Sequence, residues 1–245
     1  MTASLQSDPF VAAAIRANQE LYRTLRHPDA SRYKALQQGA GGDITHGIDQ
    51  LAEDIFVRHL QGFGEIHSEE SGRIGSGAKR IYLDPLDGSD NFLSNFPYYG
   101  TSVALEGAEG VESGIIANLA TGTIYVRHGE LFGVSGLDGI AFRPVIPNPS
   151  PKVGIFERGY RSFDGANRLK KAKIKYRIPG AVALSLALAP EVSFVLIEGA
   201  LRDFDVKAGL YMCADMYQHS AKDLTIICQE EKMFDQLRQI LLEKR

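Results

Sequence analysis

Two segments near the start of the chain carry apolar residues three or four positions apart. In the first, these include Phe10, Ala14, Leu21 and Leu25, and residues 48–60 repeat the pattern. Such spacing places the apolar side chains on one face of an α-helix. Asp8 followed by proline is typical of a helix N-terminus. We therefore predict two amphipathic helices that pack on a core through one face.

From residue 65 the pattern changes to short apolar runs separated by Gly, Asn and Asp. Such runs predict β-strands, and their spacing favours hairpins in an antiparallel sheet. The predicted strands are residues 65–67, 80–84, 99–105, 114–118, 123–127 and 130–134.

The second half alternates short apolar runs with helical patterns, which favours an α/β layer. The predicted strands are residues 152–156, 174–177, 193–198 and 224–228, and the predicted helices are 164–171, 181–189, 206–216 and 230–243. Four prolines in residues 144–151 mark a boundary between two lobes. We predict an α/β (α+β) layered sandwich. Its first lobe (1–143) holds an antiparallel sheet, its second (152–245) a mixed α/β sheet, and both form one functional unit.

Composition excludes several classes of protein. The 245 residues carry a formal net charge of −3, which argues against a general nucleic-acid or membrane-surface binder. Residues 168–177 hold six basic side chains, but without an aromatic ladder a solvated edge is favoured over a nucleic-acid site. The uncharged run 178–190 is shorter than the roughly 20 residues of a membrane span.

Localisation is predicted from the first ten residues and the cysteines. Residues 1–10 contain no Lys or Arg and no apolar h-region, so we expect no signal peptide. Cys213 and Cys228 are not spaced like the ligands of a metal site, and we predict that both are buried thiols in a reducing compartment. We expect a cytoplasmic protein without a membrane partner.

The candidate chemistry lies in residues 84–89, where Asp84 ends a predicted strand and Asp87 opens a Gly88-Ser89 turn. Two carboxylates on a rigid turn suit a hard divalent cation, and exposed N–H groups suit a phosphate. Glu69 with its neighbour Glu70 lies just upstream, and further carboxylates are Asp49, Asp203 and Asp205. Taken alone, the 84–89 segment favours a simple turn over a cation site.

Four stretches together resemble the inositol monophosphatase family, within the superfamily of lithium-sensitive phosphatases and fructose-1,6-bisphosphatases. GGDITHGID at 41–49 is similar to the loop that precedes the family's acidic helix, and SEES at 68–71 is similar to its GEES motif. DPLDGSDNF at 84–92 resembles DPIDGTTNF, and FDVKAG at 204–209 resembles WDxAAG. Their order and spacing cover most of the chain.

The resemblance implies an inositol monophosphatase-like fold and two or three Mg²⁺ ions. Glu69, Asp84 and the Leu86 carbonyl would hold the first ion, and Asp84, Asp87 and Asp205 the second. Asp49 with Glu69 would support a weaker third. Glu69 and Ser89, which replaces the family's threonine, would orient and deprotonate a metal-bound water for in-line attack on phosphorus.

The resemblance also implies a small phosphorylated substrate. Asp87, Gly88, Ser89 and Asp205 would lie against it, and Ala183 and Glu198 would lie near its hydroxyl groups. We expect hydrolysis of inositol monophosphate or a related sugar phosphate, and a homodimer. Alternatives are a fructose-1,6-bisphosphatase, a 3′-phosphonucleotide phosphatase, or a regulatory partner-binding protein that keeps its metal site. Residues 213–216 depart from the family's pattern, which leaves substrate choice open.

Overall fold

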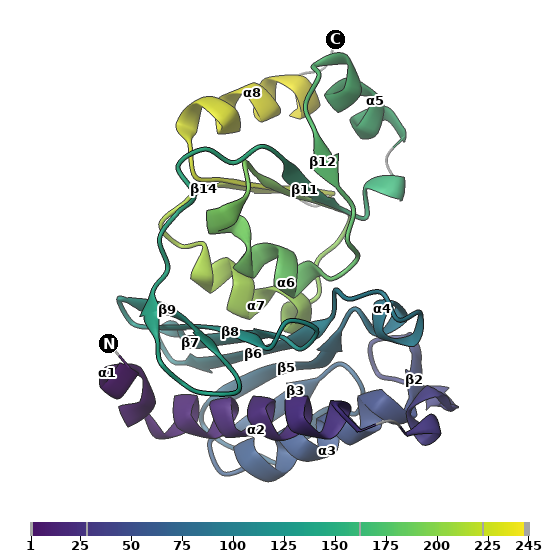
Figure 1. The fold of residues 1–245 in the computed structure, drawn as a ribbon, viewed down its shortest axis with the longest axis vertical. Helices are drawn as coiled ribbons and strands as arrows, with labels where there is room; N and C mark the ends of the chain where they lie inside the picture. The colour runs from purple at the N-terminus through teal and green to yellow at the C-terminus, as the bar shows by residue number, and fades with distance from the viewer. Residues whose placement is uncertain (1, 28, 162, 222, 243–245) are drawn as a thin grey trace.

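The computed structural model describes residues 2–27, 29–161, 163–221 and 223–242, and they form five alternating layers of helices and sheets (Figure 1). Helices α2 and α3 cover one face of a large sheet, and α6 and α7 lie between this sheet and a smaller one. Helices α5 and α8 cover the far face of the smaller sheet. The predicted layered α/β sandwich is confirmed.

The larger sheet has eight strands in the order β10-β9-β8-β7-β6-β5-β3-β4. Its neighbours are antiparallel except for β3 and β5, which run parallel. The predicted antiparallel sheet is therefore correct apart from that one pair. The strands are β3 (Glu65–Ser68), β4 (Gly72–Ile74), β5 (Arg80–Asp87), β6 (Gly100–Gly107), β7 (Gly110–Asn118), β8 (Thr123–His128), β9 (Leu131–Gly136) and β10 (Arg143–Pro144).

The smaller sheet has five strands in the order β12-β11-β13-β15-β14. It is mixed, as predicted, because β11 runs parallel to β12 and β13 whereas β15 runs antiparallel to β13 and β14. The strands are β11 (Gly154–Glu157), β12 (Tyr176–Arg177), β13 (Val195–Glu198), β14 (Tyr217–Ala221) and β15 (Leu224–Cys228). A separate hairpin joins β1 (Ala35–Gln38) and β2 (Ile44–His46).

Helix α2 begins where the sequence places a capping group. Asp8 caps α2 by accepting a hydrogen bond of 2.9 Å from the Val11 N–H, and Pro9 occupies the first turn. The helices are α1 (Thr2–Ser7), α2 (Pro9–Leu25), α3 (Gly47–Leu60), α4 (Ser89–Leu93), α5 (Phe163–Lys171), α6 (Val182–Ala187), α7 (Asp203–Met212) and α8 (Glu231–Leu242). Short 3₁₀ turns are η1 (Ala30–Tyr33), η2 (Gly159–Arg161) and η3 (Ala189–Glu191).

Four apolar clusters fill the four spaces between the layers. Alternation along β5 illustrates how the strands divide their side chains. Ile81 and Leu83 pack toward α2 and α3, whereas Tyr82 packs with α6 and α7. Because both faces of β5 are covered, seven of its eight residues are buried.

Several predicted elements need correction. The predicted helix 206–216 begins earlier and ends at Met212, so Asp203 and Asp205 lie in its first turn rather than before it. Strand β14 was not predicted, because its exposed polar residues give no clear alternation. The predicted strand 174–177 is reduced to Tyr176 and Arg177. Glu243, included in the last predicted helix, lies outside the described residues. The lobe boundary at 144–151 stays a prediction.

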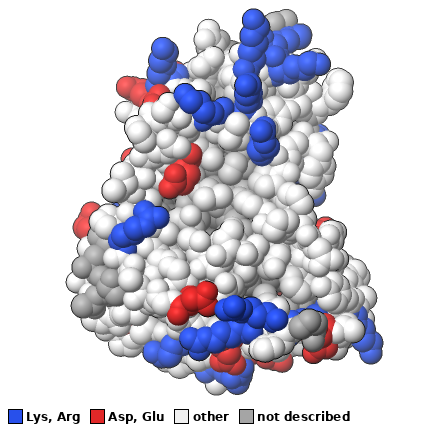
Figure 2. All heavy atoms as spheres, in the orientation of Figure 1, with Lys and Arg blue, Asp and Glu red and all other residues white. Residues whose placement is uncertain are grey.

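The basic side chains of residues 168–177 gather at one end of the molecule, over α5 and its surroundings (Figure 2). Most of them are exposed. No helix within the described residues is both long and apolar enough to cross a bilayer.

Close packing of α6 on α7 provides a test of the central layer. A Cβ atom at Gly209 would collide with the Leu186 side chain, whereas a Cβ at Gly62 meets nothing within 4 Å. We expect Gly209→Ala to lower the free energy of unfolding by about 1–3 kcal/mol through overpacking. The control Gly62→Ala should stay within about 0.5 kcal/mol of the parent chain. Urea unfolding measures both, and equal effects would contradict this account.

Candidate metal centre

Strand β5 contributes two aspartates, Asp84 and Asp87, to the wall of one pocket. Residues three apart in a regular strand point to opposite faces, but the pairing of β5 with β6 is irregular here. Asp84 pairs with Ser102 and Asp87 with Gly100, so β5 contains one extra residue, as in a β-bulge. Both aspartates line the same pocket, together with Leu86.

Gly88 turns the chain from β5 into α4. Its φ of 84° lies in the left-handed region that favours glycine. A Cβ here would also approach Ala181 Cβ and the Tyr98 carbonyl oxygen to 3.0 Å. The close turn leaves Ser89 at the start of α4, where it lines the pocket with Gly88.

Two further carboxylates reach the pocket from other elements. Glu69 follows β3, and its N–H donates to the Leu83 carbonyl of β5 at 3.1 Å. Because β3 and β5 run parallel, their carboxyl ends lie at the same sheet edge. Asp205 comes from the first turn of α7. One carboxylate oxygen each from Glu69, Asp84 and Asp205 lies within 4.8 Å of the others.

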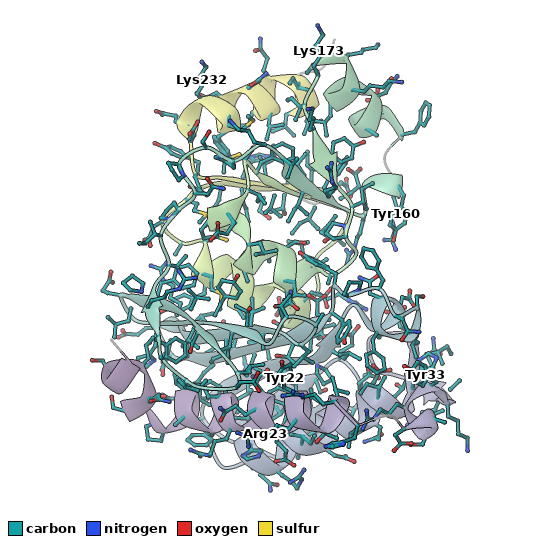
Figure 3. The ribbon with its side chains drawn as sticks, viewed as in Figure 1. Tyr22, Arg23, Tyr33, Tyr160, Lys173 and Lys232 are labelled. Carbon is teal, nitrogen blue, oxygen red and sulfur yellow. The ribbon has the colours of Figure 1, made fainter. Side chains whose placement is uncertain are left out.

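Two arginines contact Asp205. Its Oδ2 accepts from Arg202 Nε at 3.0 Å and from Arg158 Nη2 at 3.3 Å. Arg202 Nη2 also lies 2.8 Å from Glu69 Oε1. Both arginines line the pocket, and so does Tyr160 on η2. Tyr160 (Figure 3) lies on the same side of the molecule as α4 (Figure 1).

The start of α6 forms the opposite wall. Asp87 Oδ2 accepts a hydrogen bond of 2.9 Å from the Leu184 N–H. Buried Glu157, at the end of β11, accepts from the N–H groups of Gly180 and Ala181 at 3.1 and 3.3 Å. Glu157 thus holds the segment that leads into α6, and α6 holds Asp87.

Three residues predicted for the site are not among the described residues that line this pocket. Asp49 is buried in α3, where its Oδ2 accepts from the His46 N–H at 2.7 Å. Ala183 is fully buried in the apolar cluster between the large sheet and the central helices. Glu198 ends β13 and pairs in register with Leu224 of β15.

Sequence reasoning missed Arg158, Arg202, Glu157 and Tyr160. Arg202 could have been found, because it lies three residues before Asp205 and such pairs meet in a helical turn. The other three follow the predicted strand 152–156, and their contacts with residues far along the chain leave no local pattern.

The carboxylates are placed so that their negative charges are costly. Burial raises the pKa of Glu69 to about 8, and the nearby Asp205 carboxylate adds to the shift. Burial likewise raises the pKa of Asp87 to about 8 and that of Asp84 well above its ordinary value. A bound cation would stabilise the ionised form of each of these carboxylates.

The donor set fits a hard divalent cation. Asp205 Oδ1 is buried without a hydrogen-bond partner among the described residues, so one oxygen of the cluster is left for a ligand. The ligand atoms are carboxylate oxygens, together with a carbonyl at Leu86, which are the donors that Mg²⁺ prefers. Carboxylate oxygens of Glu69, Asp84 and Asp205 therefore lie close enough together to bind a single cation.

Raised pKa values predict how stability depends on pH. The folded chain holds these protons more tightly than the unfolded chain, so their stabilising effect is present below the ordinary carboxyl pKa. It is lost as pH rises through about 8. In chelator, we expect the melting temperature to fall by at least about 5 °C between about pH 5 and about pH 9.

Added Mg²⁺ should reduce this fall, because the cation replaces the protons. Circular dichroism with and without chelator measures both effects. A melting temperature that rises with pH in chelator would contradict this assignment.

Comparison with known proteins shows the family to which the chain belongs. The family model described as the inositol monophosphatase family matches residues 7–215. The chain is 32% identical to the inositol-1-monophosphatase of Mesorhizobium japonicum, over 86% of this chain and 83% of that one. It is 29% identical to the fructose-1,6-bisphosphatase/inositol-1-monophosphatase of Thermococcus kodakarensis, over 70% of this chain and 66% of that one.

Solved structures show the same fold. A crystal structure of an inositol monophosphatase–fructose 1,6-bisphosphatase superposes with a TM-score of 0.78 at 19% identity, covering 94% of this chain and 98% of that one. The fructose-1,6-bisphosphatase of Leishmania major gives a TM-score of 0.80 at 12% identity, covering 96% and 94%. Family match, relatives and fold agree, and the chain belongs to the inositol monophosphatase family of phosphoric monoester hydrolases.

Proposed function

We propose that this protein is a Mg²⁺-dependent phosphatase of small phosphate monoesters. The observation that carries the proposal is the convergence of Glu69, Asp84 and Asp205 in one pocket, with carboxylate oxygens within 4.8 Å of one another. Three buried or half-buried carboxylates at that separation repel strongly unless a cation or protons lie among them.

In this proposal, Glu69, Asp84 and Asp205 hold the cations together with Asp87 and the Leu86 carbonyl. Bound Mg²⁺ supplies a Lewis acid that lowers the pKa of water and offsets negative charge on phosphoryl oxygens. A third ion at Asp49 and Glu69 stays a prediction: Asp49 is not among the described residues that line the pocket, but its buried Oδ1 has no hydrogen-bond partner among the described residues.

The chain's own residues would orient the reactants. Glu69 is the proposed proton acceptor, because its carboxylate lies in the pocket beside Asp84 and Asp205, where a water held by the cation would be within its reach. The Ser89 hydroxyl, at the pocket wall beside Gly88, would hydrogen-bond the attacking water or the phosphate. Asp87 is held by backbone hydrogen bonds from Leu184 and Val182 at the start of α6, which fix the position of its carboxylate in the pocket.

For the substrate, we propose inositol monophosphate or a related sugar phosphate. The relatives support this class, since their names cite inositol-1-monophosphate and fructose 1,6-bisphosphate hydrolysis. The predicted substrate contacts of Ala183 and Glu198 stay predictions, and Arg158 and Tyr160 now join the candidates because they line the pocket.

One relative favours the regulatory alternative. The Nus factor SuhB of Xylella fastidiosa is 34% identical over 85 residues, which is 33% of this chain. A partner-binding role would not require turnover. The homodimer and the cytoplasmic location stay predictions, and two buried free thiols, Cys213 and Cys228, support a reducing compartment.

Phosphate release distinguishes these functions. The purified chain is assayed with inositol 1-phosphate, fructose 1,6-bisphosphate, a 3′-phosphonucleotide and NADP⁺, with Mg²⁺ and with chelator. We expect release from at least one sugar or inositol phosphate that depends on Mg²⁺. A folded, Mg²⁺-binding protein that releases phosphate from none of them would overturn the enzyme proposal and favour the regulatory one.

A variant pair tests the metal ligands. Asp87→Asn keeps the side-chain shape but removes its charge, so kcat should fall at least about 100-fold, as expected when several kcal/mol of charge stabilisation is lost. The control Asp54→Asn changes an exposed residue of α3 that bonds Gln50, and its kcat should match the parent. Equal activity of the two variants would remove Asp87 from the proposed site.

A further inference from the structure

Arg202 makes more contacts in the pocket than a simple partner of Asp205 needs. Its Nη2 lies 2.8 Å from Glu69 Oε1, and its Nε donates to Asp205 Oδ2 at 3.0 Å. Its Nη1 donates to Asp43 Oδ2 at 3.0 Å and to the Gly41 carbonyl at 3.2 Å. One guanidinium therefore joins two carboxylates of the candidate metal centre to Gly41, which lies 161 residues earlier in the sequence.

The position of Arg202 is fixed from two sides. Its carbonyl accepts the Asp205 N–H at 3.0 Å at the start of α7, and its guanidinium carbon lies 5.0 Å from the centre of the Phe204 ring. The side chain is only 35% exposed. A planar fork held in this way can share its N–H groups among several acceptors, which an ammonium group cannot do with the same geometry.

The segment that Arg202 contacts, residues 39–43, is here named loop 39–43. Its backbone lies directly on the site, because the Ala40 N–H donates to the Glu70 carbonyl at 2.8 Å and the Gly41 N–H to the Glu69 carbonyl at 2.7 Å. A Cβ at Gly41 would approach Glu69 Cγ to 2.8 Å and Arg202 Nη1 to 3.3 Å. The loop can lie this close only because residue 41 is glycine.

Arg202 and a divalent cation draw on the same two carboxylate groups, Glu69 and Asp205, although Asp205 Oδ1 itself accepts no hydrogen bond among the described residues. The guanidinium holds Glu69 Oε1 and Asp205 Oδ2, and these two residues with Asp84 make up the carboxylate cluster. A guanidinium and a doubly charged ion a few ångström apart also repel each other.

We propose that Arg202 is a positioning residue that competes with the divalent cation for Glu69 and Asp205 and that links cation binding to the attachment of loop 39–43. The inference rests on the proposed function only for the point that the pocket binds a divalent cation. When the cation draws Glu69 and Asp205 away, Arg202 loses two of its four fixed contacts, and its hold on the loop weakens. By linkage, a closed loop lowers cation affinity by the same factor by which the cation opens the loop.

Calorimetric titration with Mn²⁺ tests the competition without any turnover. We expect Arg202→Met to bind Mn²⁺ at least about tenfold more tightly than the parent chain, because one positive charge has left the site. Arg202→Lys, which keeps the charge, should stay within about threefold of the parent affinity. Lys232→Met removes an exposed charge from α8, at the far end of the molecule (Figure 3), and should leave the affinity unchanged.

Two further measurements complete the test. Asp84→Asn should abolish the Mn²⁺ heat signal, which assigns the signal to this pocket. Hydrogen exchange at the amides of residues 40 and 41 should speed up in the parent chain when Mn²⁺ is added. In Arg202→Met it should be fast already and respond little to the ion.

A folded Arg202→Met protein that binds Mn²⁺ no more tightly than the parent overturns the competition, and unchanged exchange in loop 39–43 overturns the linkage. The outcomes separate this inference from the proposed function. Tighter Mn²⁺ binding by Arg202→Met, without phosphate release by the parent chain, would support the inference and contradict the phosphatase proposal. Mg²⁺-dependent phosphate release by the parent chain, with an unchanged Mn²⁺ affinity in Arg202→Met, would support the phosphatase proposal and contradict the inference.

Discussion

The structure depends on holding mutually repelling carboxylates together. Two unit charges at 4 Å interact with about 4 kcal/mol at an effective dielectric of about 20. Carboxylates of the site meet at such separations although they come from three elements. Glu69 follows β3, Asp84 lies in β5 and Asp205 lies in α7. The chain therefore has to provide a rigid frame whose apolar packing offsets this repulsion, and the five layers provide it.

The central helix layer is the part of the frame that brings the two sheets to one site. Helices α6 and α7 pack on the large sheet through Ala183, Leu184 and Ala208, and on the small sheet through Val182, Leu186 and Val206. The same helices carry Asp205 and the Leu184 N–H that holds Asp87. Motion of the large sheet relative to this layer would separate the carboxylates, and Arg158, which follows β11 of the small sheet, bonds Asp205, so the site draws on both halves of the chain.

The sequence predicted the site best where its residues are close together in the chain. Asp84, Asp87, Gly88 and Ser89 lie on one bulged strand and turn, and the chemistry of that segment can be read locally. Glu69 and Asp205 could be added only through the family resemblance, because no local pattern shows that β3 runs parallel to β5 or that α7 begins at Asp203. The start of α7 was misplaced because Arg202, before Asp203, is not a usual cap.

The predicted substrate contacts came from the family resemblance and not from a local pattern. Ala183 lies in α6 within the apolar cluster beside the large sheet, and its contact with a substrate stays a prediction. Glu157 and Arg158 also line the pocket, from the end of β11, a strand that pairs with β12 and β13. Such neighbours are determined by strand order, which periodicity does not reveal.

The charges around the pocket explain why the protein's own cations cannot replace a metal. Among the described residues that line it, eight are acidic and two, Arg158 and Arg202, are basic. Arg158 bonds the Ala200 carbonyl and Asp205, and Arg202 is shared among four acceptors, so neither offers a full charge to Asp84 or Asp87. Both aspartates are buried, and burial is the first cause of their raised pKa values. Near neutral pH they therefore need either protons or an external cation, and a site of this composition favours the doubly charged one.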